Sequence, residues 1–222
     1  MSGKGALRWE DALAAAPLWL YAGDLLPELP QYQTHIGLTP YGGSPRTICH
    51  DLCDPMPIPD GIVDVYQAED VFEHIPYDQL PAVIADIHRG LKPGGLFRLS
   101  VPDYRFDHYM KRSLRDADGR ILFDPGGGGR YENDQVVDGG HVWFPVFELV
   151  EELMTASPFA ADGRIDFRHY TAPDGSAVMR PIDYALGNIQ RTPDHDPRAQ
   201  APRRPMSIVV DAWKAPDGAR NA

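Results

Sequence analysis

RTICHDLCDPMPIPDGIVDVYQAEDVFEHIPYDQLPAVIADIHRGLKPGGLFRLSVPD, residues Arg46–Asp103, is the stretch that decides the fold. Two apolar runs typical of strands, Ile62–Ala68 and Gly95–Val101, enclose a segment with helical spacing. In that segment the apolar residues recur at steps of three and four: Leu80, Val83, Ile84, Ile87 and Leu91. The pattern predicts a strand–helix–strand unit.

The end of this helix is marked by the turn Lys92–Gly95. A cation suits a helix C-terminus, and proline followed by glycines does not continue a helix. A strand–helix–strand unit places its two strands in parallel through a right-handed crossover. We therefore expect a doubly wound α/β sheet whose ligands bind beyond the carboxyl ends of the strands.

Composition limits the function classes. The 222 residues suffice for one domain with a sizeable core, and 43% hydrophobic with 24% charged residues is ordinary for a globular protein. The net charge of -11 argues against binding to a nucleic-acid backbone, which requires a basic surface. We find no signal segment or membrane-spanning run and expect a cytoplasmic protein. Two cysteines are too few for a disulfide framework.

Two passages carry a resemblance to a known family. DLCDPMPIPDGIVDVYQAEDVFEHI followed by LKPGGLFRLSVPD resembles the central half of class I S-adenosylmethionine-dependent methyltransferases. It is most similar to small predicted bacterial methyltransferases found near glycan-biosynthesis genes. MRPIDYALGNIQRTPDHDPRA and SIVVDAWK resemble the C-terminal end of that group, so that the resemblance extends from Leu18 to Lys214.

The resemblance implies one domain over residues 1–222, with a Rossmann-like seven-stranded sheet in the order 3-2-1-4-5-7-6 and strand 7 antiparallel. Apolar runs supply the remaining strands, and short amphipathic segments supply helices. We expect strands within residues 17–24, 33–38, 46–50, 164–170 and 207–213, and helices within 9–16, 104–115 and 145–155. An insertion after strand 5, residues 104–140, is expected to form a lid over the acceptor. Residues 171–205 are expected to form a long loop.

The resemblance also implies a site for S-adenosylmethionine, with S-adenosylhomocysteine as the product. The residues expected to bind it follow the first, third and fourth strands: Tyr21, Ala22, Gly23, Asp24, Asp51, Leu52, Gln67 and Glu69. Asp51 is the first choice, as acceptor for the adenine amino group. Two features depart from the family pattern. Gly23 stands alone where the family has two or three glycines, and residues 37–39 lack the acidic residue that binds the ribose, a contact that Asp24 could supply.

Three residues are candidates for catalysis: His141, Asp70 and His74. A neutral imidazole accepts a proton near pH 7, and His141 stands where related proteins carry a histidine. Each has a structural alternative, because Asp70 and His74 suit the entry to a helix and His141 suits a helix cap. Cys49 and Cys53 lack the second ligand pair of a zinc site, so that the sequence predicts no metal site.

Arginines in the long loop provide candidate contacts to the acceptor. The guanidinium groups of Arg180, Arg191 and Arg198 could bind a carboxylate or phosphate, or could pair with the acidic surface of the protein itself. The function that these features predict is methyl transfer to a small molecule, with a sugar or glycan-precursor hydroxyl as acceptor. The main alternative is a scaffold of methyltransferase fold without catalysis. A third alternative, a nicotinamide-dependent oxidoreductase, is disfavoured because the first strand of this sequence lacks the GxGxxG motif of that class. The sequence leaves the oligomeric state open, and a homodimer is one of the alternatives.

Overall fold

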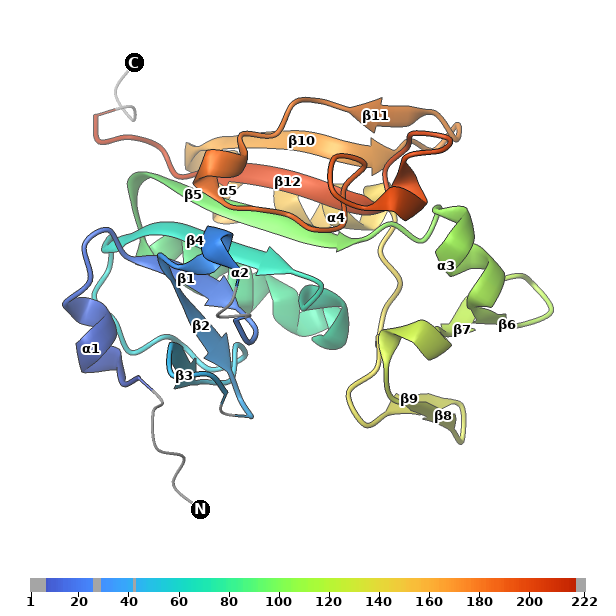
Figure 1. The fold of residues 1–222 in the computed structure, drawn as a ribbon, viewed down its shortest axis with the longest axis horizontal. Helices are drawn as coiled ribbons and strands as arrows, with labels where there is room; N and C mark the ends of the chain where they lie inside the picture. The colour runs from blue at the N-terminus through green and yellow to red at the C-terminus, as the bar shows by residue number, and fades with distance from the viewer. Residues whose placement is uncertain (1–6, 26–28, 42, 219–222) are drawn as a thin grey trace.

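A computed structural model describes residues 7–25, 29–41 and 43–218. Its centre is an eight-stranded sheet in the order β11-β10-β12-β5-β4-β1-β2-β3 (Figure 1). The strands are β1 (Trp19–Ala22), β2 (His35–Thr39), β3 (Thr47–Cys49), β4 (Val63–Glu69), β5 (Leu91–Pro102), β10 (Arg164–Thr171), β11 (Ala177–Met179) and β12 (Ser207–Trp213). Strands β1 to β5 are mutually parallel, and β12 is antiparallel to both of its neighbours.

Two differences separate this sheet from the predicted one. The three-residue strand β11 pairs with β10 inside the predicted loop 171–205 and adds an eighth, edge strand. Strand β5 already begins at Leu91, so the predicted turn Lys92–Gly95 lies within this strand, beside an irregularity in its pairing with β4. The strand absorbs this turn because Gly94 adopts a positive φ of 76°.

The helices are shorter than predicted at two places. Helix α1 spans Trp9–Leu13, and helix α3 spans only Asp107–Arg112 because Ser113 is extended and Leu114 enters a hairpin. Helices α2 (Leu80–Gly90) and α4 (Phe147–Thr155) follow the expected pattern, whereas the short helix α5 (Pro158–Asp162) was not predicted. No helix in the described ranges is long and apolar enough to cross a membrane.

The two faces of the sheet differ in polarity because side chains alternate along each strand. One face is apolar and packs with residues of α2, α4 and α5, and Figure 1 shows α2 and α4 behind the sheet. Its strand residues include Leu20, Leu38, Tyr66, Ala68, Phe97, Leu99, Val101, Ile208 and Val210. The opposite face carries buried polar side chains, namely His35, Gln67, Glu69, Arg98, Ser100, Ser207 and Asp211.

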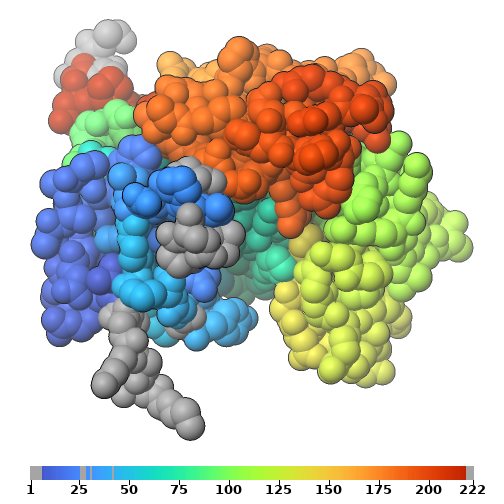
Figure 2. All heavy atoms as spheres, in the orientation of Figure 1, coloured from blue at the N-terminus to red at the C-terminus, as the bar shows by residue number. Residues whose placement is uncertain are grey.

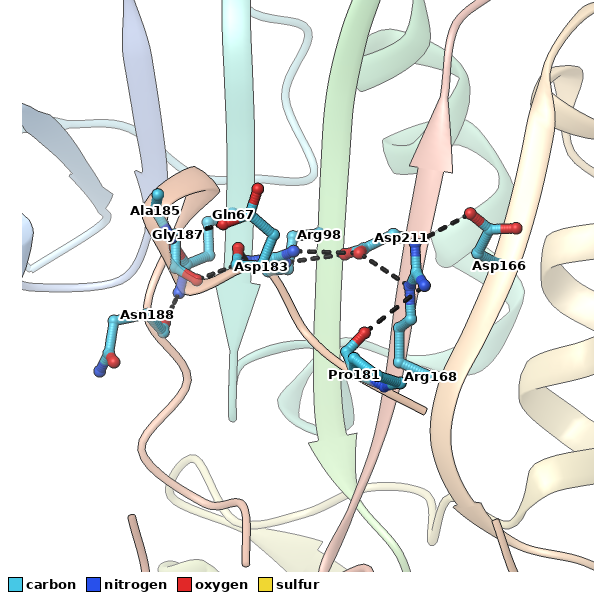
Figure 3. A network of polar contacts seen from close by, with 10 residues as sticks. All are labelled: Gln67, Arg98, Asp166, Arg168, Pro181, Asp183, Ala185, Gly187, Asn188 and Asp211. Carbon is cyan, nitrogen blue, oxygen red and sulfur yellow. Dashed lines mark hydrogen bonds and ion pairs between the residues drawn. The ribbon is translucent and has the colours of Figure 1, made fainter. Parts of the chain in front are cut away.

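Residues 180–205, here called the strap, cross the polar face where a doubly wound fold would place helices (Figure 3). The fully buried Arg98 binds both oxygens of Asp211, at 2.7 and 3.0 Å, and donates to the carbonyls of Asp183 and Gly187 in the strap. Gln67 donates to the carbonyl of Asn188. The polar face is therefore matched to the backbone of the strap.

The insertion after β5 forms a small lobe beyond the carboxyl end of that strand (Figure 1). It contains α3, the hairpin β6 (Leu114–Arg115) with β7 (Ile121–Phe123), and the hairpin β8 (Arg130–Glu132) with β9 (Gln135–Val137). Tyr104, Phe106 and Tyr109 form a second apolar cluster with Ala199 and Met206 near the end of the strap. The lobe is thus packed against the strap. Its predicted role as a lid stays a prediction.

Candidate functional site

A cavity of about 460 Å³ lies at the carboxyl ends of β1, β2 and β3. Its wall includes the loops after these strands, the segment after β4 and the end of the insertion: Gly23, Leu38, Thr39, Pro40, Tyr41, Asp51, Leu52, Cys53, Val71, His74, Ile75, Pro76 and Gly139. Figure 2 shows the molecule hollowed between the N-terminal strands and the insertion. This position and volume are those of a ligand site in an open α/β sheet.

Gly23 makes the turn that leaves β1. Its φ of +111° is strained for any residue with a side chain, and its N–H donates to the Leu38 carbonyl at 2.7 Å. A Cβ at this position would stand 3.4 Å from Val71. The turn therefore exposes backbone, without a side chain, at the wall of the cavity.

Asp51 stands at the wall of the cavity, just beyond β3. Its Oδ1 accepts the Cys53 N–H at 3.0 Å, and the residue is otherwise exposed, so that its carboxylate has acceptor capacity left. Leu52 adds apolar surface beside it. The cavity thus fits an adenosyl group with respect to volume, backbone access and an acceptor for an amino group. Of the eight residues predicted to bind the cofactor, Gly23, Asp51 and Leu52 line this cavity.

Three others, Tyr21, Asp24 and Glu69, line a separate cavity of about 150 Å³. The Oδ1 of Asp24 accepts the N–H groups of Leu25, at 3.0 Å, and Ser44, at 3.3 Å, which fixes the turn after β1. Asp24 is absent from the wall of the larger cavity, where the predicted ribose contact would be needed. Residues 26–28, which follow this turn in the sequence, lie outside the described ranges.

Glu69 and Asp70 hold the strap at the carboxyl end of β4. The Oε1 of Glu69 accepts the N–H groups of Gln190 and Arg191 at 2.7 and 3.0 Å, and Arg191 pairs with Asp70 at 2.8 Å. Burial raises the pKa of Glu69 to about 8. Asp70, predicted as catalytic, lines the smaller cavity and has a φ of +54°. These carboxylates therefore bind the protein's own loop.

The remaining predicted positions are buried or paired. Ala22 and Gln67 have no exposed surface, and Gln67 binds the strap. Of the three arginines proposed to contact the acceptor, Arg191 pairs with Asp70 and Arg198 pairs with Asp196, whereas Arg180 is exposed. Two of the three are thus held by carboxylates of the protein.

The two predicted catalytic histidines come together. The rings of His74 and His141 meet edge to face at 4.7 Å between centroids, although 67 positions separate them along the chain. His74 belongs to the short 3-10 helix η2 (Phe72–His74), and His141 ends the insertion. His74 lines the larger cavity, whereas His141 is only 4% exposed. Burial lowers the pKa of His141 to about 3, so its imidazole is neutral near pH 7.

Side chains that sequence reasoning missed surround His141. Its Nδ1 lies 2.5 Å from the hydroxyl of Tyr104, which donates to Asp124 at 2.7 Å, and Arg112 pairs with Asp124 at 2.6 Å. Glu73 is fully buried with its Oε1 3.6 Å from the Nε2 of His141. The one available signal was a carboxylate directly before His74, in a segment otherwise apolar.

Comparisons with known proteins give one family match and several similar solved structures. Residues 12–99 match the family model described as a methyltransferase domain, and no curated protein matches the chain. A S-adenosylmethionine-dependent methyltransferase from Methanosarcina mazei is 11% identical over 90% of this chain and 92% of its own, with a TM-score of 0.48. The 16S rRNA (adenine(1408)-N(1))-methyltransferase from Catenulisporales acidiphilia is 12% identical over 97% and 98%, with a TM-score of 0.48.

A third similar structure is the 1,6-didemethyltoxoflavin-N1-methyltransferase from Burkholderia thailandensis, solved with S-adenosylhomocysteine. It is 12% identical over 89% of this chain and 71% of its own, with a TM-score of 0.47. The matched residues 12–99 contain β1 to β4, α2 and most of β5, and hence most of the wall of the larger cavity. Residues 12–99 of this chain are thus similar to a methyltransferase domain.

Proposed function

We propose that this protein transfers the methyl group of S-adenosylmethionine to a hydroxyl group of a small molecule, and that the acceptor is a sugar or glycan precursor. The observation that carries the proposal is the 460 Å³ cavity, whose wall includes Gly23, Asp51 and His74. We assign the end with Gly23 and Asp51 to the adenosyl group and the end with His74 to proton acceptance.

At the first end, the chain itself supplies contacts for the nucleoside. The Asp51 carboxylate would accept a hydrogen bond from the adenine amino group, and the Gly23 backbone would approach the donor closely. When bound, the donor supplies an activated methyl group on a sulfonium. The protein then contributes alignment and exclusion of water, which explains why no catalytic triad is needed.

At the second end, the imidazole of His74 can receive a proton. The Nδ1 of His74 is 2.7 Å from the Gly139 carbonyl, which only accepts, so Nδ1 carries the proton and Nε2 has the free lone pair. A hydroxyl nucleophile needs such an acceptor, whereas an unprotonated amine does not. The net charge of -11 favours a small neutral acceptor over a nucleic acid.

Calorimetric titration with S-adenosylhomocysteine tests the binding end. We expect the wild type to bind with submillimolar affinity. Asp51→Ala should bind at least about tenfold more weakly because it loses one charge-assisted hydrogen bond, whereas Asp54→Ala should bind with unchanged affinity. Asp54 is also exposed, three positions along, and is absent from the wall of the cavity. If the protein does not bind S-adenosylhomocysteine at millimolar concentration, the scaffold alternative is favoured. If heat is released on titration with NADH instead, an oxidoreductase is favoured. Transfer of labelled methyl groups to a panel of sugars tests the acceptor class.

A further inference from the structure

Three side chains of the types that bind metals converge behind the acceptor end of the larger cavity. One ligand atom each from Glu73, His74 and His141 lies within 4.8 Å of the other two. Glu73 and His74 are neighbours in η2, and His141 arrives from the end of the insertion. The cluster is therefore formed by folding of the insertion onto the sheet, and no local sequence spacing reveals it.

The hydrogen bonds of the two histidines fix which nitrogen is free. The Gly139 carbonyl accepts a hydrogen bond from the Nδ1–H of His74, as described above. The hydroxyl of Tyr104 donates its single hydrogen bond to Asp124. Its oxygen therefore accepts a hydrogen bond from the Nδ1–H of His141. In both neutral rings the lone pair is consequently on Nε2. Histidines that ligate metals are typically held in this way, by a partner on the other ring nitrogen.

Glu73 supplies the carboxyl group of the cluster. It has no exposed surface, and neither of its oxygens accepts a hydrogen bond within the described part of the chain. Its Oε1 faces the Nε2 of His141 at 3.6 Å, too far for a hydrogen bond. The guanidinium group of Arg191, which lies in the same region, pairs with the carboxylate of Asp70. Burial raises the pKa of Glu73 well above its usual range, so that this carboxyl group and the Nε2 lone pair face each other in a buried space where a proton or a metal cation between them is stabilising.

The spacing suits a metal ion. Two ligands of one ion stand roughly 3–3.5 Å apart when each bond is ~2.0–2.2 Å. The pair of Glu73 and His141 is close to that spacing, and His74, which is only partly buried, needs a small movement to join it. Because His74 and Gly139 line the larger cavity, the open side of the cluster faces the acceptor end.

We propose that Glu73, His74 and His141 bind one divalent transition-metal ion, such as Zn²⁺ or Co²⁺, with its open coordination positions directed into the cavity. Two imidazoles and one carboxylate are a ligand set for such ions. The open positions suit an oxygen ligand, and a bound ion lowers the pKa of a coordinated hydroxyl. That catalytic role rests on the proposed function, whereas binding of the metal does not. This proposal differs from the expectation from sequence that the chain has no metal site.

Titration of tag-free, metal-stripped protein with Co²⁺ tests the site. We expect one ion per chain with visible absorption bands, displaced by Zn²⁺, and at least 100-fold weaker binding in Glu73→Gln and in His141→Ala. His108→Ala is the matched control, because it removes an exposed histidine of the insertion outside the cluster, and it should bind as the wild type does. Circular dichroism of each variant separates loss of the site from loss of the fold.

Two results would overturn the metal site: no Co²⁺ or Zn²⁺ binding by the wild type, or equal binding by folded His141→Ala. If S-adenosylhomocysteine still bound, the proposed function would stand with the imidazole of His74 as proton acceptor. If the metal bound but S-adenosylhomocysteine did not, the proposed function would fail and the metal site would remain. Tyr104→Phe adds a further check, since loss of the hydroxyl that orients His141 should weaken Co²⁺ binding by ~10–100-fold.

Discussion

His35 is a buried histidine whose charge state should govern stability at acidic pH. Its ring has no exposed surface and meets Trp19, Tyr21 and Tyr32 edge to face at 5.1, 6.2 and 5.7 Å between centroids. Burial, with a smaller effect from the Arg46 guanidinium, lowers the pKa of His35 to about 4 from 6.5. The native state therefore holds a neutral imidazole that the unfolded chain protonates more readily.

The magnitude follows from linkage. The pKa of His35 is lower in the native state than in the unfolded chain. The contribution of this neutral imidazole to the free energy of unfolding is therefore complete above pH 6.5 and is lost as the pH falls from 6.5 towards 4. At about 1.4 kcal/mol for each tenfold change in proton affinity, the full loss is roughly 3 kcal/mol, of which about 2 kcal/mol falls between pH 7 and pH 5. Below pH 4 both states bind the proton and the effect is constant.

Urea denaturation of the wild type and of His35→Phe, at pH 7 and at pH 5, measures this effect. The free energy of unfolding of the wild type should fall by about 2 kcal/mol more than that of His35→Phe, since phenylalanine fits an aromatic surrounding and does not titrate. His108→Phe removes an exposed imidazole and should follow the wild type. Equal losses in wild type and His35→Phe would refute the assignment of a neutral buried imidazole.

Two further predictions concern the polar face and the turn after β1. Arg98→Met should destabilise the protein by roughly 3–5 kcal/mol in denaturant titrations because Asp211 stays buried with its main partner removed, while Arg120→Met, in an exposed pair, should leave stability unchanged. Gly23→Ala and Gly94→Ala should each lose about 1 kcal/mol of stability, because both glycines have positive φ. Calorimetry should show weaker S-adenosylhomocysteine binding in Gly23→Ala alone, since Gly94 is absent from the cavity wall; equal binding would separate Gly23 from the cofactor site.

The parallel half of the sheet could be predicted because local signals there agree. Apolar strands around an amphipathic helix specify the unit β4–α2–β5, and the family resemblance supplied the order of its neighbours. Strand β11 could not be predicted, since three residues within a polar loop carry no periodic pattern. The strap was equally hidden: its position depends on Arg98 and Gln67, which are polar residues inside strands and have no local partner.

Part of the candidate site could also be predicted. Gly23 and Asp51 follow strand ends, and the carboxyl edge of a parallel sheet brings such positions together. Glu69 and Asp70 follow a strand end as well, yet they bind the strap, because position on the sheet does not determine which loop lies above it. The contacts of Glu73 depend on an insertion whose path no local rule fixes.

The strap and the insertion divide the carboxyl edge of the sheet between them. The strap holds Glu69 and Asp70, and its Gln190 lines the 150 Å³ cavity beside them. The insertion brings His141 to His74 and borders the 460 Å³ cavity through Gly139. Because the two segments share the apolar cluster of Tyr104, Phe106 and Tyr109, a change in the strap should also reach the orientation of His141 through Tyr104. Glu69 and Asp70 thus pair with the strap, whereas His74 faces the larger cavity.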